Sequence, residues 1–460
     1  MDDDIEILDI FDEDKKKPPV KVEKKEIKKE EPMKTSTKKK KRKLKTKSLQ
    51  IAFCSVSALF ILGCIIFYGS RFIKYYRIYN PKVDSSDGSV LLAQNITGNS
   101  EIVYQGSGLY SSSGNYIYKG DVKDNYLMYN NMLWRILKIN VDNSIDIILD
   151  DYLNILPWNK EVTDFSSSSI NDYLNKDFLN NIDKDLLVKV NYCEDKIEDL
   201  NNITCDKKNN EQYVKLLDIT SFLNSVKEKK SYLVSDDEIF WLSDYNTDKV
   251  WHTNSVNVSQ SDSNIFYEVR PVIKLKNTVT YSKGEGTKDN PYIVGDNKIG
   301  LGSIVKLGDD NWIIYDMGNN VRLMREKSLE KTMMFDKESL DFDKSSLNEY
   351  LNKEYLDSLS YKDKIISNDY YTGKYSEDLE DVKKSKVNVK VGIPSILDIK
   401  LNSEVNGYFT STSNDESIYV YENPLRQSRS ISYRNIRPCI TLKKDYIDKL
   451  EYNDGVWEEK

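Results

Sequence analysis

The sequence predicts an α+β fold in which a single transmembrane helix precedes two tandem α+β repeats. One apolar, uncharged stretch covers residues 49–69. Two later regions show the same order of hairpin, amphipathic helix and Arg-Pro strand. Charged residues form 31% of the 460-residue chain and hydrophobic ones 39%, which is typical of a largely globular protein with two or three domains.

The apolar stretch reads LQIAFCSVSALFILGCIIFYG over residues 49–69, 21 residues without a charge. At about 1.5 Å per residue a helix of this length spans about 30 Å, the thickness of the hydrocarbon layer. A buried core helix, the alternative, would normally keep a polar face. No Ala-x-Ala cleavage site follows the stretch, so we expect a signal anchor in the lipid bilayer and not a cleaved signal peptide.

Flanking charge predicts the orientation of this helix. Residues 38–47 hold eight basic side chains, against only Arg71, Lys74 and Arg77 in the first turns after the stretch. The N-terminus is therefore expected in the cytoplasm and the C-terminal domains outside the cell. Residues 1–48 mix acidic and basic side chains and are expected to form a disordered tail, either simply solvated or docking a cytoplasmic partner.

The net charge excludes a nucleic-acid partner. Residues 1–48 carry +5, and because the whole chain carries −7, residues 49–460 carry −12. Phosphate backbones require a basic surface, which such a region does not offer.

Each repeat opens with a hairpin. The first strand contains Trp134 in one copy and Trp312 in the other, and a polar turn leads to alternating strands at 145–147 and 321–323. Alternation with a period of two around a polar turn is the signal of a hairpin.

A helix follows each hairpin, at residues 166–179 and 344–356. Its apolar side chains recur at i, i+3, i+4 and i+8, which places them on one helical face. They are Ile170, Tyr173, Leu174 and Phe178 in the first copy and Leu347, Tyr350, Leu351 and Tyr355 in the second. Serines before both helices can cap the free N–H groups.

The rest of each repeat also recurs. A Leu-Asp-Ile segment occurs at 217–219 and 397–399, and an aromatic step contains Trp241 or Phe409, both expected in the core. The strands EVRPVIKLK (268–276) and NIRPCITLK (435–443) close the repeats. We expect Arg270 and Arg437 in these apolar strands to form ion pairs or to bond backbone carbonyls.

These patterns predict the domain boundaries. Beyond the cytoplasmic tail (1–48) and the anchor (49–69), an extracellular linker covers residues 70–100. Module 1 covers 101–277, a turn-rich linker 278–296 and module 2 297–445, and residues 446–460 form a tail.

The order W-R-I/V-L, then S-x-I/L-x-x-Y/W-L-N-x-x-F/Y, then an aromatic step and V/I-R-P-x-I/L-x-L resembles a family of surface modules. This is the domain-of-unknown-function family six-two-seven-three of low-GC Gram-positive bacteria, and the resemblance covers most of 125–276 and 303–443. That family is similar to the C-type-lectin-like fold of formylglycine-generating enzymes. The resemblance therefore implies two tandem C-type-lectin-like repeats.

Catalytic residues and metal ligands are not predicted. Formylglycine-generating enzymes use two cysteines, whereas here only Cys439 lies in a comparable place, where a buried core residue is expected. The single histidine, His252, lies in a polar stretch where an exposed loop is expected, without a G-x-S-x-G or H-E-x-x-H motif. We therefore expect no enzyme, no metal and no cofactor.

Cys193 and Cys205 lie in a polar insertion and are expected to form a disulfide outside the cytoplasm. The aromatic residues Tyr245, Trp251, Tyr419 and Tyr421 precede the Arg-Pro strands, where loops of lectin-like folds contact ligands, and are equally compatible with a core role. The predicted function is noncatalytic binding or adhesion to a protein or glycan at the cell surface. The alternatives are an envelope enzyme, either formylglycine-generating-like or a wall hydrolase, and a transmembrane sensor acting through the N-terminal tail.

Overall fold

The structure, a computed structural model, describes residues 63, 67–69, 90–193, 195–205, 212–235, 238–296, 298–401 and 407–460. The chain divides at residue 70 into two compact units, and almost all described residues belong to the second. The predicted tail 1–48, most of the predicted anchor 49–69 and residues 70–89 lie outside the described residues. Within the described ranges, no helix combines the length and the apolar character needed to cross a membrane.

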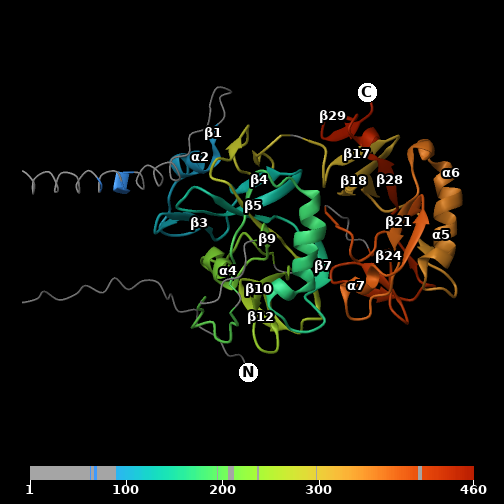
Figure 1. The fold of residues 1–460 in the computed structure, drawn as a ribbon, viewed down its shortest axis with the longest axis horizontal. Helices are drawn as coiled ribbons and strands as arrows, with labels where there is room; N and C mark the ends of the chain where they lie inside the picture. Colours follow the sequence, from blue (N-terminus) through green and yellow to red (C-terminus); the bar gives the residue numbers. More distant parts are fainter. Residues whose placement is uncertain are drawn as a thin grey trace, which may run out of the picture. The chain divides into compact units, whose positions relative to one another are not determined.

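The fold is α+β, as predicted, and its larger sheet is built from residues 108–293 (Figure 1). The main order is β16-β4-β5-β6-β14-β8, while β3 pairs with β2 and β5, and β9 pairs with β14. Only β16 and β4 run parallel. The strands are β2 (Gly108–Ser112), β3 (Asn115–Lys119), β4 (Tyr126–Tyr129), β5 (Met132–Ile139), β6 (Ile145–Leu149), β8 (Leu187–Val188), β9 (Val214–Lys215), β14 (Val272–Leu275) and β16 (Tyr292–Ile293).

The second sheet is built from residues 304–458 and has the order β23-β28-β19-β18-β17-β30-β29. Here only β17 and β30 run parallel. The strands are β17 (Ile304–Leu307), β18 (Asp310–Asp316), β19 (Asn320–Arg325), β23 (Val391–Gly392), β28 (Cys439–Lys443), β29 (Glu451–Asn453) and β30 (Val456–Glu458). The predicted hairpins are confirmed, because β5 pairs with β6 and β18 with β19 in antiparallel register.

Smaller sheets surround the two large ones. Two are three-stranded, β10-β11-β12 and β24-β25-β26, and the rest are the pairs β7–β13, β20–β27, β21–β22 and β1–β15. Their bounds are β1 (Val90–Leu91), β7 (Asn154–Pro157), β10 (Trp241–Tyr245), β11 (Val250–Asn254), β12 (Asn257–Ser261), β13 (Phe266–Val269), β15 (Thr280–Tyr281), β20 (Met333–Met334), β21 (Asn368–Tyr371), β22 (Lys386–Val389), β24 (Tyr408–Ser413), β25 (Ile418–Tyr421), β26 (Arg426–Ser428) and β27 (Tyr433–Arg434).

Two composite helices lie where the sequence predicts them, and both contain a π-helical stretch. The first comprises η2 (Phe165–Ser167), α3 (Ser169–Asp172), η3 (Tyr173–Phe178) and η4 (Leu179–Asn181), and the second η5 (Phe342–Lys344), α5 (Ser346–Tyr350), η6 (Leu351–Tyr355) and α6 (Leu356–Ser358). The remaining helices are α2 (Leu92–Asn99), α4 (Ile219–Ser225), η7 (Lys362–Lys364), α7 (Leu379–Val382) and α8 (Lys444–Ile447).

The predicted caps and apolar faces of the composite helices are confirmed. The Ser168 hydroxyl accepts from the Asn171 amide, and the Ser345 hydroxyl accepts from the Asn348 amide. The face that begins at Ile170 is buried along its whole length, and in the second helix only Tyr350 is half-buried. Burial of these apolar faces against the sheets stabilises helices that are too short to persist alone.

An asparagine fastens each composite helix to the short strand beside it. The Asn175 side-chain amide donates to the Val214 carbonyl at 2.9 Å and accepts from the Val214 N–H at 3.2 Å. The Asn352 amide makes the same two bonds with Val391, at 2.8 and 3.0 Å. Each side chain therefore bonds both the N–H and the carbonyl of one strand residue, as a neighbouring strand would, and so satisfies these backbone groups.

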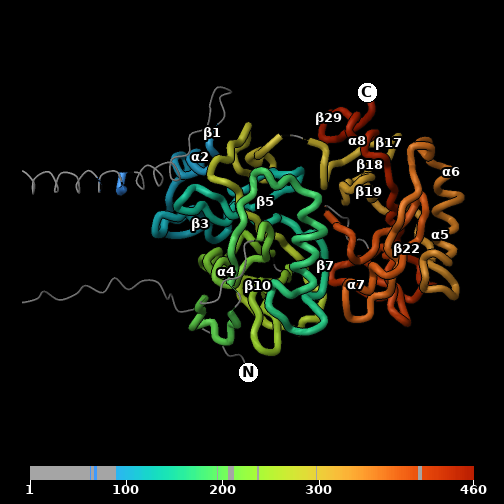
Figure 2. The backbone as a smooth tube through the Cα atoms, viewed as in Figure 1, coloured from blue at the N-terminus to red at the C-terminus, as the bar shows by residue number. Residues whose placement is uncertain are grey.

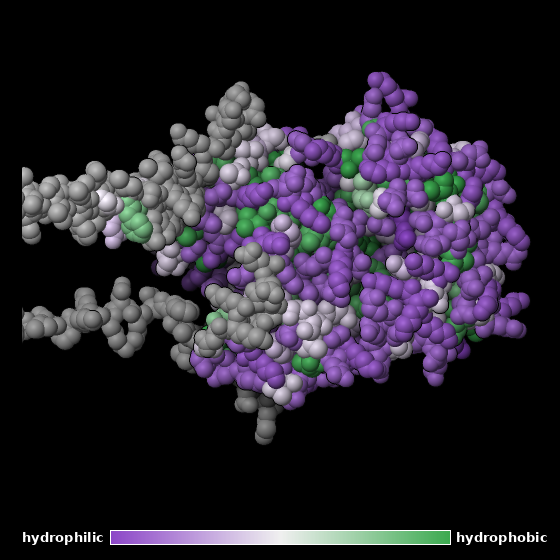
Figure 3. Space-filling view, in the orientation of Figure 1, coloured by the Kyte–Doolittle hydropathy of each residue, from purple (hydrophilic) through white to green (hydrophobic). Residues whose placement is uncertain are grey.

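One hydrophobic core cluster contains residues of both sheets, whose backbone traces are drawn in Figure 2. Residues on either side of position 300, such as Trp134 and Cys439, belong to one buried cluster. The Asn154 side-chain amide donates to the carbonyls of Ile396 at 2.8 Å and Asp398 at 3.1 Å. The face of the molecule shown in Figure 3 is mainly hydrophilic, in contrast to this interior.

Candidate functional site

The two aromatic hairpins, β10–β11 and β24–β25, hold the four rings that the sequence singles out as ligand contacts. Tyr245 is half-buried, whereas Trp251, Tyr419 and Tyr421 are 6%, 5% and 0% exposed. A ligand-binding role for the four stays a prediction. In the observed arrangement, three of these rings are shielded from solvent by other parts of the chain.

The insertion that contains the disulfide covers the first hairpin. The Trp251 indole N–H donates to the Ile197 carbonyl at 3.0 Å, and the Ile197 N–H donates to the Tyr245 carbonyl at 2.9 Å. The Thr247 hydroxyl also donates to the Glu198 carboxylate at 2.6 Å. Residues 195–205 therefore form a cover over Trp251 that hydrogen bonds hold in place.

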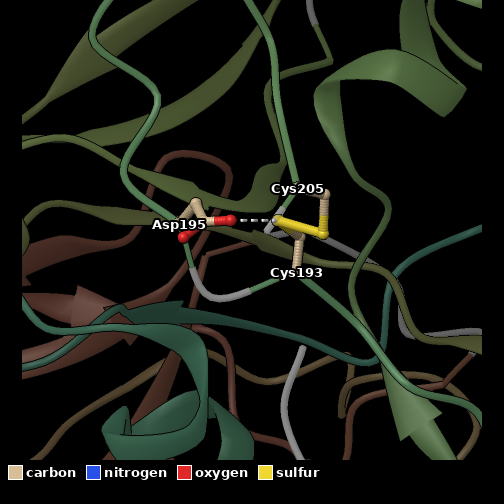
Figure 4. A group of neighbouring side chains, drawn as sticks. All are labelled: Cys193, Asp195 and Cys205. Carbon is tan, nitrogen blue, oxygen red and sulfur yellow. Dashed lines mark hydrogen bonds between the residues drawn. A yellow bond between two sulfur atoms is a disulfide. The ribbon is translucent and has the colours of Figure 1, made fainter. Parts of the chain in front are cut away.

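The predicted disulfide between Cys193 and Cys205 is present, with Cα atoms 5.6 Å apart (Figure 4). The Asp195 carboxylate lies 3.6 Å from the Cys193 sulfur. Together the three side chains form the one group of three potential metal ligands found among the described residues. Both sulfurs are consumed in the disulfide, and a metal would require the thiolate form, so this group acts as a covalent closure of the cover.

Removal of this disulfide is expected to open the cover over Trp251. A Cys193→Ser/Cys205→Ser variant should lose about 3 kcal/mol of unfolding free energy, the loop-entropy value for a loop of this length. Denaturant unfolding followed by tryptophan fluorescence measures the loss, and hydrogen exchange at the Ile197 amide reports the local opening. Reductant should reproduce both effects in the wild type and leave the double variant unchanged. Equal stability of the two proteins would contradict the role of the disulfide.

The second aromatic hairpin packs against the first half of the chain. The Phe266 ring meets Tyr375 at 5.3 Å and Tyr419 at 6.0 Å between centroids. Beside these rings, the Lys160 ammonium forms a 2.7 Å ion pair with the Glu377 carboxylate. Tyr419 is thus covered by Phe266 from the first half of the chain and by Tyr375.

A buried lysine lies near the same junction. The Lys400 ammonium donates to the carbonyls of Ser395 and Asp398, and it lies 5.2 Å from the centre of the Tyr421 ring. Burial lowers the pKa of Lys400 to about 8, because transfer of the ammonium from water disfavours its charged form. The lysine is therefore a buried donor that holds the loop 395–398, and its backbone N–H donates to the Leu153 carbonyl at 2.8 Å.

The expectation of an exposed loop for His252 is wrong. His252 lies in β11 and is only 5% exposed. Its Nε2 lies 2.9 Å from the Ser261 hydroxyl and its Nδ1 lies 2.8 Å from the Thr253 carbonyl. Burial lowers the pKa of His252, so the neutral ring is favoured. A serine-histidine pair is present, but Nδ1 faces a backbone carbonyl where a catalytic triad places a carboxylate.

The predicted core roles are confirmed. Trp241, Phe409 and Cys439 are completely buried. Burial raises the pKa of the Cys439 thiol far above its usual range, which opposes formation of the nucleophilic thiolate. Arg270 bonds the carbonyls of Leu149, Leu233 and Asp150, and Arg437 bonds those of Arg325 and Glu326, so both arginines make the backbone bonds that the sequence predicts as one of their two roles.

Glu268 is a buried carboxyl at the junction and is 2% exposed. It accepts a 2.6 Å hydrogen bond from the Asn423 side-chain amide. Burial, with the nearby Glu238 carboxylate, raises its pKa from an ordinary value near 4.5 to about 7 in spite of the Arg270 charge. The carboxyl is therefore protonated in the folded protein at mildly acidic pH.

This pKa shift predicts that the stability contribution of Glu268 depends on pH. Because the folded-state pKa is raised, the contribution is full below about pH 4.5 and is lost as the pH rises through about 7. In the Glu268→Gln variant the amide oxygen can still accept from Asn423. Relative to this variant, the free energy of unfolding of the wild type should fall by about 2 to 3 kcal/mol between pH 4.5 and 8. Denaturant unfolding of both proteins across this range measures the difference. A pH-independent difference would contradict the shift.

Sequence reasoning missed the residues that join the two halves, notably Asn154, Phe266 and Tyr375. Phe266 and Tyr267 form an aromatic pair just before an Arg-Pro strand, a signal that was available. Asn154 carries no local signal for its contact with the second half, because the carbonyls of Ile396 and Asp398 lie more than 240 positions away. The chain matches no protein-family model, no curated protein and no solved structure.

Proposed function

We propose that this chain is a single-pass, membrane-anchored surface protein with two noncatalytic binding modules of the family it resembles. The observation that carries the location is the disulfide Cys193–Cys205. Disulfides persist outside the cytoplasm and are rare within it. This agrees with the basic cluster at 38–47 before the apolar stretch 49–69, which predicts export of everything that follows.

Matching strand orders support the duplication. In the first sheet β4-β5-β6-β14 are neighbours, and β14 also pairs with β9, while β17-β18-β19-β28-β23 are neighbours in the second. A late strand pairs in parallel with the first strand of each series, β16 with β4 and β30 with β17. Two unrelated folds would seldom share both this order and the same exception to antiparallel pairing.

Matching hydrogen bonds support the duplication residue by residue. Arg270 bonds the carbonyls of Leu149 and Asp150, and Arg437 bonds those of Arg325 and Glu326. The helix-to-strand bonds of Asn175 and Asn352 join residues 39 positions apart in both modules.

Burial of the reactive side chains supports binding over catalysis. The Cys439 thiol is fully buried with a raised pKa, and His252 is buried and bonded through both ring nitrogens. An enzyme of the envelope would need such groups to converge on a site that admits substrate. The ligand class that suits a noncatalytic surface module is a protein or a glycan.

Protease treatment of intact cells tests the location. Cells that express the full chain are treated with proteinase K, and the fragment from residue 90 onward is detected with an antibody. We expect its loss in intact cells and an oxidised Cys193–Cys205 pair by alkylation mass spectrometry. A variant without residues 49–69 should be protected and reduced. Protection of the membrane-bound wild type would overturn the external location.

Ligand screening tests the binding role. The full chain in lipid nanodiscs is applied to glycan arrays and to isolated envelope proteins, with empty nanodiscs as the control. Saturable binding without chemical change in the ligand is expected. Release of soluble products from wall polymer, abolished by Ser261→Ala, would show instead that the serine-histidine pair is catalytic.

A further inference from the structure

One short sheet in each module carries an aromatic residue at the same register. Phe266 in β13 pairs with Pro157 in β7, and Tyr433 in β27 pairs with Met334 in β20. Both aromatics stand four positions before the arginine of the Arg-Pro strand. Under the proposed duplication, on which this inference rests, Phe266 and Tyr433 are therefore equivalent positions that face the same side of their sheets.

The environment next to these sheets is also duplicated. Trp158 packs against Phe165 and Trp241 at 5.9 and 6.0 Å between centroids. Phe335 packs in the same way against Phe342 and Phe409, at 6.2 and 5.5 Å. A lysine follows two positions after the anchoring ring in each case, Lys160 in module 1 and Lys337 in module 2.

In module 1 this surface is covered by the rest of the chain. Phe266 contacts Tyr375 and Tyr419, which also contact each other edge to face at 5.9 Å. The Lys160 ammonium pairs with the Glu377 carboxylate at 2.7 Å. The cover thus consists of the Tyr375 ring and the Glu377 carboxylate, two residues apart in sequence, and the Tyr419 ring packs against Tyr375.

In module 2 the equivalent surface is open. Tyr433 is 64% exposed and Ile431 is 47% exposed, while Met333 and Met334 are half-buried beside them. Lys337 is exposed and has no carboxylate partner within the described part of the chain. These five residues form what we call the Tyr433 surface. Tyr433, Met334 and Lys337 stand at the sequence positions that correspond to Phe266, Pro157 and Lys160 on the covered side of module 1.

We propose that the Tyr433 surface docks a segment of another protein that carries an aromatic residue followed two positions later by an acidic one. The chemistry is that of Tyr375 and Glu377, which cover the equivalent surface in module 1. A second copy of this chain does not supply this segment, because its own Tyr375 and Glu377 already contact Phe266 and Lys160. The ring fills the space beside Tyr433 and the carboxylate pairs with Lys337.

A peptide with the sequence of residues 372–381, TGKYSEDLED, tests the proposal. It is titrated against the full chain in nanodiscs, with line broadening of the peptide's own NMR signals as the readout. We expect saturable binding with a dissociation constant of about 0.1 to 1 mM, weak because the peptide supplies one ring and one carboxylate. Tyr433→Ala should weaken binding at least about tenfold, and Tyr433→Phe should retain it.

A charge reversal gives the sharper result. Lys337→Glu should weaken binding about fivefold or more, and a peptide with lysine in place of Glu377 should restore it. Tyr104→Ala, at another highly exposed tyrosine, is the matched control and should bind as the wild type does. Thermal unfolding of each variant verifies that the exposed substitutions leave the fold intact.

Three results of the peptide titration would overturn the proposal. These are the absence of saturable binding, equal binding of a scrambled peptide, and binding that neither Tyr433→Ala nor Lys337→Glu changes. Concentration-dependent dimerisation of the full chain that Tyr433→Ala abolishes would assign the surface to a second copy and also overturn it. This experiment does not depend on cellular location, so its failure leaves the protease and ligand-screening results standing.

Discussion

Replacement of Arg270 with methionine is expected to destabilise the protein by about 3 kcal/mol. The side chain is 2% exposed, and its guanidinium donates to the carbonyls of Leu149, Leu233 and Asp150. Methionine fills much of the same volume but leaves these acceptors without their donor, at about 1 to 3 kcal/mol for each buried group. Methionine carries no charge, so the variant avoids the cost of burying the guanidinium, and this offsets part of the lost free energy of unfolding.

Denaturant unfolding of the full chain measures the effect. Arg437→Met should behave similarly, because Arg437 is 0% exposed and also bonds two backbone carbonyls. Arg426→Met is the matched control, since its side chain is 64% exposed and forms a surface ion pair with Glu422, and should change stability by less than about 0.5 kcal/mol. A loss below about 1 kcal/mol for Arg270→Met would contradict the assigned role.

Replacement of Asn154 with leucine should destabilise the protein by about 2 to 4 kcal/mol. The side chain is fully buried, and its amide donates to the carbonyls of Ile396 and Asp398 while its oxygen accepts from the Ile155 N–H. Leucine is similar in size, so the loss arises from the missing hydrogen bonds: the Ile396 carbonyl and the Ile155 N–H lose the Asn154 side chain, while the Asp398 carbonyl keeps the Lys400 ammonium. Because two of these groups lie in the second half of the chain, the contact between the halves should weaken most.

Two measurements separate local from global effects. Denaturant unfolding gives the total loss, and limited proteolysis reports exposure of the loop 395–401, which we expect to be cut faster in the variant. Asn388→Leu serves as the control, because the Asn388 side chain is exposed and bonds only Asp369 at 2.8 Å. Wild-type stability and wild-type cleavage of Asn154→Leu would show that the bonds to the second half contribute nothing.

Much of each module could be predicted because its signals are local. The hairpins at Trp134 and Trp312 follow from alternation, and the composite helices follow from apolar spacing and serine caps. The bonding of Arg270 and Arg437 to backbone carbonyls follows from their place within apolar strands. In each case neighbouring residues in sequence determine which face becomes buried.

The candidate site could be predicted only in part, because burial there depends on distant segments. Trp251 reads as a surface aromatic in a polar stretch, yet an insertion about 50 positions earlier covers it. Tyr419 and Tyr421 are shielded where the two halves meet, through residues such as Phe266 that stand more than 150 positions away. The burial of His252 has a more local cause: the residue lies within β11, and Ser261 and Tyr267, at most 15 positions later, contact its ring.

The return of each Arg-Pro strand to the start of its own module also affects how the protein is made. Arg270 bonds a carbonyl 121 positions earlier, and Arg437 bonds one 112 positions earlier. More than a hundred further residues must therefore be synthesised after each apolar hairpin before the Arg-Pro strand that pairs with it is available. Contacts of such long sequence range slow folding and leave strand edges open meanwhile, so the newly made chain passes through stages in which β6 and later β19 each have an unpaired edge that β14 or β28 covers in the folded protein.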